Sequence, residues 1–254
     1  MALIILGGLG FIVLRDINIW FTRIFKRRKK PFKFLLQSRI VLITSSFLIV
    51  SGGILLLVLG SSTFLKEFDF STATLVSLFQ SVTARTAGFN TINIGALTRS
   101  ALWVLILLMF IGASPGSTGG GIKTTTFFIL SSLVYSRFKG KRKVEWGGRR
   151  IGTNNISEAI VVFFLSIAVV LFSIFLLCLT EPFATEDIIF EVFSAFGTVG
   201  LSTGITPQLS GFAKLVIVIT MFIGRLGPLS IALAIPTRRK KENITRLEER
   251  VMIG

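Results

Sequence analysis

Two glycine-centred segments of this chain contain residues that could hold a dehydrated cation. They read Thr86-Ala-Gly-Phe89 and Thr198-Val-Gly-Leu201, and one constant offset in the sequence relates them. A cation that leaves water needs replacement oxygen ligands, which backbone carbonyls supply in selectivity filters. Glycine adopts the dihedral angles that aim successive carbonyls at one axis, and Gly88 and Gly200 fit this role. The candidate ion-binding residues are Thr86, Ala87, Gly88, Phe89, Thr198, Val199, Gly200 and Leu201.

The sequence context of the two segments repeats as well. The offset that relates them also places Met109-Phe-Ile-Gly112 on Met221-Phe-Ile-Gly224. A short apolar stretch precedes each segment, at residues 70–82 and 187–196, and we expect a half-helix there whose C-terminal dipole points toward the cation. The alternative is two ordinary extracellular turns. That alternative explains one Thr-x-Gly segment, but it explains poorly why two occur in matching context.

A third unusual segment, Gly112-Ala-Ser-Pro-Gly-Ser-Thr-Gly-Gly-Gly-Ile-Lys123, interrupts an apolar run. One proline and five glycines within ten residues cannot continue as a regular helix. The segment approaches the phosphate-binding pattern G-x-x-x-x-G-K-[ST], but it has one residue too many before the lysine and follows no soluble strand. No acidic cluster is available for magnesium either. We therefore do not expect an enzyme.

Composition shows what must position these segments. Hydrophobic residues make up 52% of the 254-residue chain, and its mean hydropathy is +0.79. The runs Ile40–Leu65, Ser100–Ile122 and Ala159–Thr180 carry no charge, and about 20 apolar residues in a helix suffice to cross a bilayer. The expected fold is an all-α polytopic membrane protein. The broken segment Gly112–Lys123 then lies at membrane depth, where irregular backbone must line water or be buried in protein.

The charge distribution indicates sidedness rather than nucleic-acid binding. The formal net charge is +16, and Lys and Arg cluster in Arg23–Arg39, Arg137–Arg150 and Arg238–Arg250. The connections expected on the opposite side, around residues 67–69 and 181–187, carry acidic residues instead. This alternation follows the positive-inside rule, so the basic segments are expected in the cytoplasm, against lipid headgroups. The chain has no His and only Cys178, which excludes a disulfide framework or a Cys/His zinc site within it.

A consistent sidedness requires each short half-helix and its loop to be re-entrant, so the repeated unit is helix, half-helix, filter loop, helix. The expected elements are Ala2–Trp20, Ile40–Gly60, 70–82, Thr83–Thr91 and Ser100–Ser136, followed by Ser157–Thr180, Asp187–Phe196, Gly197–Thr206 and Phe212–Ile235. Leu6-Gly-Gly-Leu-Gly10 aligns with Ile223-Gly-Arg-Leu-Gly227, which indicates the last helix of a preceding unit. The expected organisation is residues 1–38 for that helix and a basic loop, 39–150 for one full unit, and 151–254 for another with a basic tail. The chain is thus expected to begin midway through a repeat, as in a truncated reading frame; a signal peptide at Met1–Leu14 is the alternative, but its flanking residues do not fit.

These motifs in combination resemble the Trk/Ktr/HKT potassium transporters. The resemblance rests on Thr-Ala-Arg-Thr-Ala-Gly-Phe-Asn-Thr, Ser-Pro-Gly-Ser-Thr-Gly-Gly-Gly-Ile-Lys-Thr-Thr-Thr, Ser-Ala-Phe-Gly-Thr-Val-Gly-Leu-Ser-Thr-Gly and Met-Phe-Ile-Gly-Arg-Leu-Gly-Pro. The Ile-Lys-Thr-Thr-Thr form is most similar to the bacterial Ktr membrane subunit. That family has four such units around one pore, and this chain matches the third and fourth units plus the last helix of the second. The resemblance therefore implies about half of a pseudo-fourfold cation pore.

The resemblance also implies a gate. The segment Gly112–Lys123 is similar to the family's intramembrane loop beneath the filter, and Arg225 is implied to face the pore below it. Snorkelling is the alternative for Lys123, and a structural ion pair is the alternative for Arg225. Arg85, beside the first filter, is expected to pair with an outer carboxylate or with loop carbonyls. The candidate gating residues are Gly116, Gly119, Gly120, Gly121, Lys123 and Arg225.

The expected function is potassium uptake across the bacterial inner membrane, in a multi-pass protein with cytoplasmic basic loops. The resemblance further implies sodium dependence or co-conduction, a cytoplasmic nucleotide-binding regulatory subunit, and a homodimer of complete subunits. No cofactor is expected beyond the transported K⁺ or Na⁺. Because two filter loops are absent from this chain, transport is expected to require the N-terminal half of the pore. A membrane receptor or assembly protein without transport is the alternative.

Overall fold

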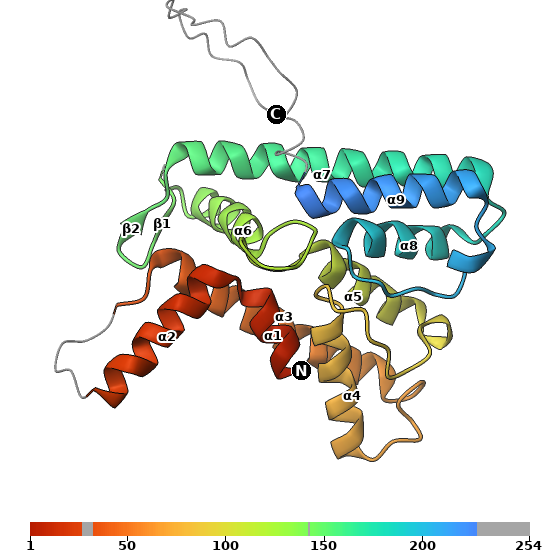
Figure 1. Cartoon of the computed structure of the whole chain (residues 1–254), viewed down its shortest axis with the longest axis horizontal. Helices are drawn as coiled ribbons and strands as arrows, with labels where there is room; N and C mark the ends of the chain where they lie inside the picture. The colour runs from red at the N-terminus through yellow and green to blue at the C-terminus, as the bar shows by residue number, and fades with distance from the viewer. Residues whose placement is uncertain (27–32, 142, 228–254) are drawn as a thin grey trace, which may run out of the picture.

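The computed structural model describes residues 1–26, 33–141 and 143–227, which are mostly helical (Figure 1). The repeated order of long helix, short helix, loop and helix is present twice, as the sequence predicts. The helices are α1 (Ala2–Leu9), α2 (Phe11–Phe25), α3 (Leu36–Gly60), α4 (Phe70–Thr83), α5 (Arg99–Phe110), α6 (Thr124–Phe138), α7 (Thr153–Thr180), α8 (Thr185–Gly197) and α9 (Gly211–Leu226). Two short 3₁₀ turns lie at Ile94–Ala96 and Thr206–Gln208. Two-residue strands β1 (Glu145–Trp146) and β2 (Arg149–Arg150) form an antiparallel hairpin in the second basic segment, where the sequence predicts only a loop.

The first complete unit consists of α3, the short helix α4, a loop, and the broken pair α5 and α6. Among the described residues, α3 and α7 are the single helices whose length and composition suffice to cross a membrane. The predicted inward helix Ser100–Ser136 is interrupted between Phe110 and Thr124, where proline and the glycines disfavour a helix. The second unit consists of α7, α8, a loop and α9, which pack against one another (Figure 1).

The first apolar segment is not one straight helix. Helices α1 and α2 meet at an angle of 109° at Gly10, whose φ of 78° lies in the region that favours glycine. Gly227, which aligns with Gly10 in the sequence, ends α9 with a φ of 85°. The part of the predicted helix Phe212–Ile235 that follows Gly227 lies outside the described residues.

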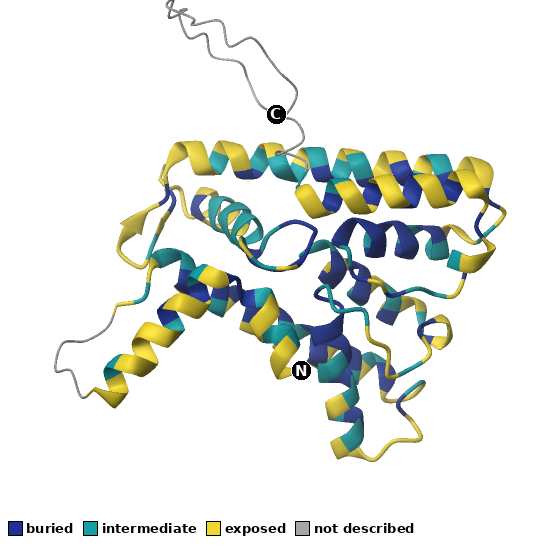
Figure 2. Cartoon of the chain, in the orientation of Figure 1, coloured by how far each residue is buried: buried dark blue, intermediate teal, exposed yellow. Residues whose placement is uncertain are grey.

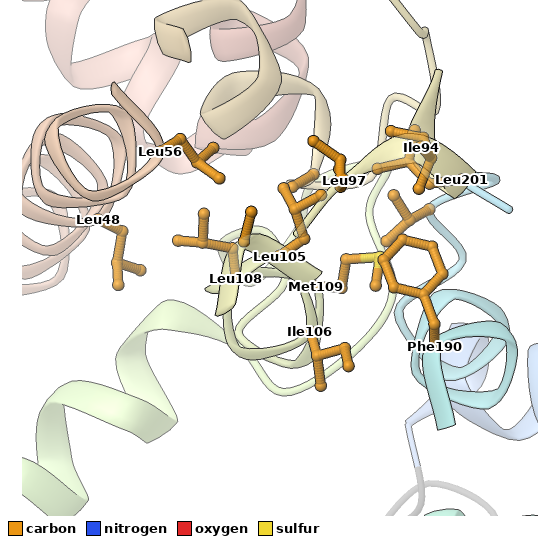
Figure 3. Packing of buried hydrophobic residues seen from close by; sticks show 13 residues of the cluster. Leu48, Leu56, Ile94, Leu97, Leu105, Ile106, Leu108, Met109, Phe190 and Leu201 are labelled. Carbon is orange, nitrogen blue, oxygen red and sulfur yellow. The ribbon is translucent and has the colours of Figure 1, made fainter. Parts of the chain in front are cut away.

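One hydrophobic cluster joins the two units behind their loops. It contains Leu48 and Leu56 of α3, Phe190 of α8, and four residues of α5, namely Leu105, Ile106, Leu108 and Met109 (Figure 3). The loop residues Val199 and Leu201 belong to the same cluster and are 4% and 1% exposed. The two units therefore share one packed interior, which fixes the position of one loop relative to the other.

Large apolar side chains cover the outside of the molecule. Figure 2 shows extensive exposure along α7 and α9, whereas α8 is mostly buried. The exposed residues on α7 include Phe164, Phe172 and Leu179. Apolar exposure on this scale is unusual for a soluble monomer and is expected where helices face lipid. The chain is a membrane protein.

Candidate functional site

The two glycine-centred loops share an unusual backbone conformation. Thr86 and Thr198 have φ angles of 72° and 51°, and no other non-glycine residue in the described part of the chain has a positive φ. Gly88 and Gly200, two residues further on, have φ angles of 75° and 94°. Positive φ in a β-branched residue is strained and persists only where surrounding contacts enforce it. Because the same strain occurs at corresponding positions, surrounding contacts must enforce the conformation of both loops, which distinguishes them from ordinary turns.

The loops lie side by side at their glycines. A β-carbon on Gly200 would lie 3.7 Å from Gly88 Cα. A β-carbon on Gly88 would overlap the carbonyl oxygen of Val199 and lie 3.2 Å from Gly200 Cα. Glycine is therefore required at position 88 both by its backbone angle and by the approach of the second loop.

The bulky residues of the two loops differ in burial. Val199 and Leu201 pack into the hydrophobic cluster behind the second loop. Phe89 of the first loop is instead 63% exposed. Its backbone is nevertheless held, since the Phe89 N–H donates to the Thr83 hydroxyl at 2.8 Å.

Both short helices end directly at the loops. Thr83, the last residue of α4, accepts hydrogen bonds from Ala87 N–H at 3.0 Å and Gly88 N–H at 3.3 Å through its carbonyl. At the end of α8, the Val199 N–H donates to the Ser194 carbonyl at 2.9 Å. The negative ends of two helix dipoles thus lie at the two loops, where they favour a cation.

The broken segment between α5 and α6 packs against the same two loops. The Gly120 N–H donates a 3.0 Å hydrogen bond to the Thr198 hydroxyl. A β-carbon on Gly119 would overlap the Thr86 hydroxyl, and one on Gly120 would lie 2.6 Å from the Thr198 hydroxyl. Two consecutive glycines therefore bring the backbone against the strained threonine of each loop.

Other contacts fix the ends of this segment. A parallel bridge joins Ile111 to Ile122 and closes the segment on itself. The Ser114 N–H and hydroxyl donate to the Gly8 carbonyl, each at 3.0 Å, at the end of α1. The Gly121 N–H donates to the Gly224 carbonyl of α9 at 3.2 Å. The segment thus contacts the C-terminal ends of α1 and α9 as well as both loops.

The remaining predicted gating glycine, Gly116, also has a packing role. Its φ is 73°, and a β-carbon there would lie 2.7 Å from the Phe11 ring. The Gly116 carbonyl accepts a hydrogen bond from the Phe11 N–H at 3.3 Å. Gly116 therefore docks the segment against the bend between α1 and α2.

Two cationic side chains lie near the broken segment. The Lys123 ammonium donates to the Gly119 carbonyl at 2.6 Å, so it turns into the segment rather than toward the membrane surface. Arg225 is exposed near the end of α9 and lies close enough to repel Lys123 electrostatically. Within residues 1–26, 33–141 and 143–227, neither cation forms an ion pair with a carboxylate.

Arg85 has a scaffold position beside the first loop. It is 8% exposed, and its guanidinium donates to the Ser45 hydroxyl at 3.2 Å and to the Gly112 carbonyl at 3.4 Å. The described residues supply carbonyl and hydroxyl partners for it but no carboxylate. Of the two kinds of partner expected for Arg85, the carbonyl is the one observed.

A carboxylate that the sequence motifs do not single out lies behind the second loop. Glu191 on α8 is 5% exposed and accepts hydrogen bonds from the hydroxyls of Ser202 and Thr206. A signal was available, because Glu191 is an ionisable residue in an otherwise apolar stretch, which at membrane depth indicates a functional position. The aligned residue in the first unit is Phe79, so a comparison of the repeats alone does not find it.

Comparisons with known proteins agree with this architecture. The family described as TrkH, a cation transport protein, matches residues 1–246. The chain is 39% identical to the potassium/sodium uptake protein NtpJ of Enterococcus hirae, a match that covers all of this chain and 56% of that protein. It is 37% identical to the Ktr system potassium uptake protein D of Bacillus subtilis, again over all of this chain and 56% of the relative. The chain thus spans about half the length of the curated relatives it matches.

The fold is also similar to a solved structure. The potassium transporter TrkH from Vibrio parahaemolyticus superposes with a TM-score of 0.65 and 20% sequence identity, over 79% of this chain and 44% of that protein. At this identity the likeness concerns the fold.

Proposed function

Because the chain belongs to the TrkH family of cation transport proteins, we propose that it forms two of the filter loops of a potassium uptake pore. The observation that carries the proposal is the pair of strained Thr-x-Gly loops, side by side at the ends of two helices. The carbonyls of residues 86–89 and 198–201 replace the hydration shell of the ion. The names of the curated relatives, which specify potassium or potassium and sodium uptake, support this choice of ion.

The broken segment Gly112–Lys123 acts as the gate of this pore. It lies against Thr86 and Thr198, so an ion that leaves the filter meets its backbone first. The ammonium of Lys123 and the guanidinium of Arg225 add a positive barrier along the same path. Opening requires the hydrogen bond from Gly120 to Thr198 to break.

We also propose an organisation for the whole pore, based on the units in this chain. Residues 1–38, 39–150 and 151–254 correspond to the end of a second unit and to the third and fourth units. The remaining filter loops come from polypeptide that matches the part of the relatives this chain does not cover. The basic segments lie on the cytoplasmic side of a bacterial inner membrane. We further propose a homodimer of complete subunits, sodium dependence or co-conduction, and a cytoplasmic nucleotide-binding regulatory subunit, as the resemblance to Ktr-type subunits implies.

Complementation tests the proposal. A bacterium without potassium uptake receives this chain alone, or the chain fused behind the uncovered N-terminal part of the Ktr system potassium uptake protein B of Bacillus subtilis. We expect the fusion to restore growth at low external potassium, and the chain alone to fail because two filter loops do not close a pore. A fusion that reaches the membrane but takes up no potassium, while the intact relative does, would refute the proposal in favour of a receptor or assembly protein.

A further inference from the structure

A buried carboxylate holds the outer end of the second filter loop. Glu191 lies on α8 and accepts from the Ser202 hydroxyl through one oxygen and from the Thr206 hydroxyl, at 2.9 Å, through the other. The two hydroxyl oxygens lie 2.8 Å apart, and the Ser202 oxygen also accepts from the Gly204 N–H at 2.9 Å. The carboxylate therefore fixes the turn that directly follows residues 198–201.

The opposite end of the loop is fixed by a different set of contacts. The Thr198 N–H donates to the Ala195 carbonyl at 2.9 Å, and the Thr198 hydroxyl accepts from the Gly120 N–H. The four proposed carbonyl ligands thus lie between two anchors. One is the hydrogen bond from Gly120 of the broken segment, and the other is the pair of hydrogen bonds to Glu191. Because a hydrogen bond to an ionised group is shorter and stronger than a neutral one, the Glu191 anchor is the stiffer of the two.

The first filter loop has no equivalent of Glu191 and its two hydroxyl donors at the aligned positions. The positions aligned with Glu191, Ser202 and Thr206 are Phe79, Asn90 and Ile94, which offer no carboxylate and no pair of hydroxyls. That loop is held instead by the Thr83 hydroxyl, which accepts from the Phe89 N–H. Two loops of similar sequence are therefore positioned by different chemistry.

We propose that Glu191 is a positioning residue that sets the carbonyl spacing of the fourth-unit filter loop, and thereby the preference of the pore for potassium over sodium. Glu191 does not contact the ion, since its two oxygens are occupied by Ser202 and Thr206 on the rear of the loop. Selectivity depends on this spacing because a smaller cation is preferred once the oxygens can move inward. The inference rests on the proposed potassium pore.

The test uses Glu191→Gln in the fusion of this chain behind the N-terminal part of the relative, which we call the pore-complete fusion. It measures potassium uptake and the inhibition of that uptake by sodium in the same cells. The glutamine amide keeps the shape of the carboxylate but loses its charge. We therefore expect the selectivity of uptake for potassium over sodium, called here the potassium-to-sodium ratio, to fall by about three- to tenfold. Ser202→Ala, which keeps the carboxylate and removes one donor, is expected to lower the ratio in the same direction. A ratio is independent of the amount of folded protein, so a merely structural role would leave it unchanged.

Glu181→Gln is the matched control. Glu181 is also buried, at 9% exposure, but it accepts from the Ser210 N–H at the start of α9 and not from the filter loop. We expect its potassium-to-sodium ratio to equal that of the unmodified fusion. If Glu191→Gln or Ser202→Ala transports potassium with the unmodified ratio, the inference is wrong and the filter assignment stands. If the unmodified fusion transports no potassium, the proposed function fails first.

Discussion

Replacement of Gly88 by alanine tests the geometry of the filter most directly. Gly88 and Gly200 occupy corresponding positions and both have positive φ, but their surroundings differ. A β-carbon on Gly88 would overlap the Val199 carbonyl oxygen, whereas one on Gly200 would only touch Gly88 Cα at 3.7 Å. The structure therefore ranks two glycines that the sequence treats as equivalent: alanine is more harmful at position 88.

The expected effect has two parts. An alanine held in the left-handed region costs roughly 1–2 kcal/mol, and this cost applies to both glycines. At Gly88 the Val199 carbonyl must also move by roughly 1 Å before the new β-carbon reaches an ordinary contact distance. Because that carbonyl is a proposed ion ligand, we expect Gly88→Ala to lower the potassium-to-sodium ratio about tenfold, which equals about 1.4 kcal/mol of discrimination. Gly200→Ala should lower the ratio less.

The assay is potassium uptake with sodium as competitor, in cells that carry the pore-complete fusion. Gly204→Ala is the control, because Gly204 has a φ of 108° and no atom within 4 Å of its β-carbon position. This control carries backbone strain just after the second loop, without any collision. A Gly88→Ala ratio equal to that of the unmodified protein, or an equal loss in Gly204→Ala, would show that the approach of the two loops does not set selectivity.

Three further predictions concern the gate and the outer surface. Arg225→Ala should raise potassium uptake by removing a positive charge from the path, and an uptake rate at or below the unmodified value would contradict a barrier role. Thr198→Val keeps the side-chain shape but removes the acceptor of the Gly120 N–H. Loss of this hydrogen bond, worth about 1 kcal/mol, should raise potassium uptake up to about fivefold. An unchanged uptake rate would show that this contact does not hold the gate closed. The Thr72 side chain and backbone hold the pKa of Asp69, the N-cap of α4, below its ordinary value. The ionised cap should therefore stabilise α4 above the unfolded-state pKa and lose this effect as pH falls through the lowered pKa, so thermal unfolding of Asp69→Asn should show a weaker acid dependence than that of the unmodified chain.

The sequence was sufficient for the order of helix, half-helix, loop and helix in the two repeated units and for the family. The charge-free runs and the alternating basic and acidic connections predicted the membrane helices, because a bilayer core imposes length and apolarity on any helix that crosses it. Proline and clustered glycines predicted the break between α5 and α6, since these residues disfavour a helix regardless of context. The predicted ends of α3, α4, α7 and α8 coincide with those of the structure or differ from them by up to four residues, because caps and neighbouring helices decide where a helix ends.

The sequence did not predict interactions between distant residues. The 109° bend at Gly10 depends on the docking of Phe11 against Gly116, a contact between segments that are far apart in the chain. The role of Glu191 depends on Ser202 and Thr206 folding back over α8. The exposure of Phe89 likewise follows from which neighbours surround it, and no periodicity in the sequence reports this.

The sequence by itself determined that two Thr-x-Gly loops exist and that each follows a short helix, because dihedral preferences and apolar length are local properties. Only the tertiary structure decided that Gly88 lies against Val199 and Gly200, and that Gly119 and Gly120 lie against Thr86 and Thr198. Those approaches require two units to share one hydrophobic cluster behind their loops (Figure 3). The proposed filter and gate are defined by such distances between segments, and packing rather than local preference sets them.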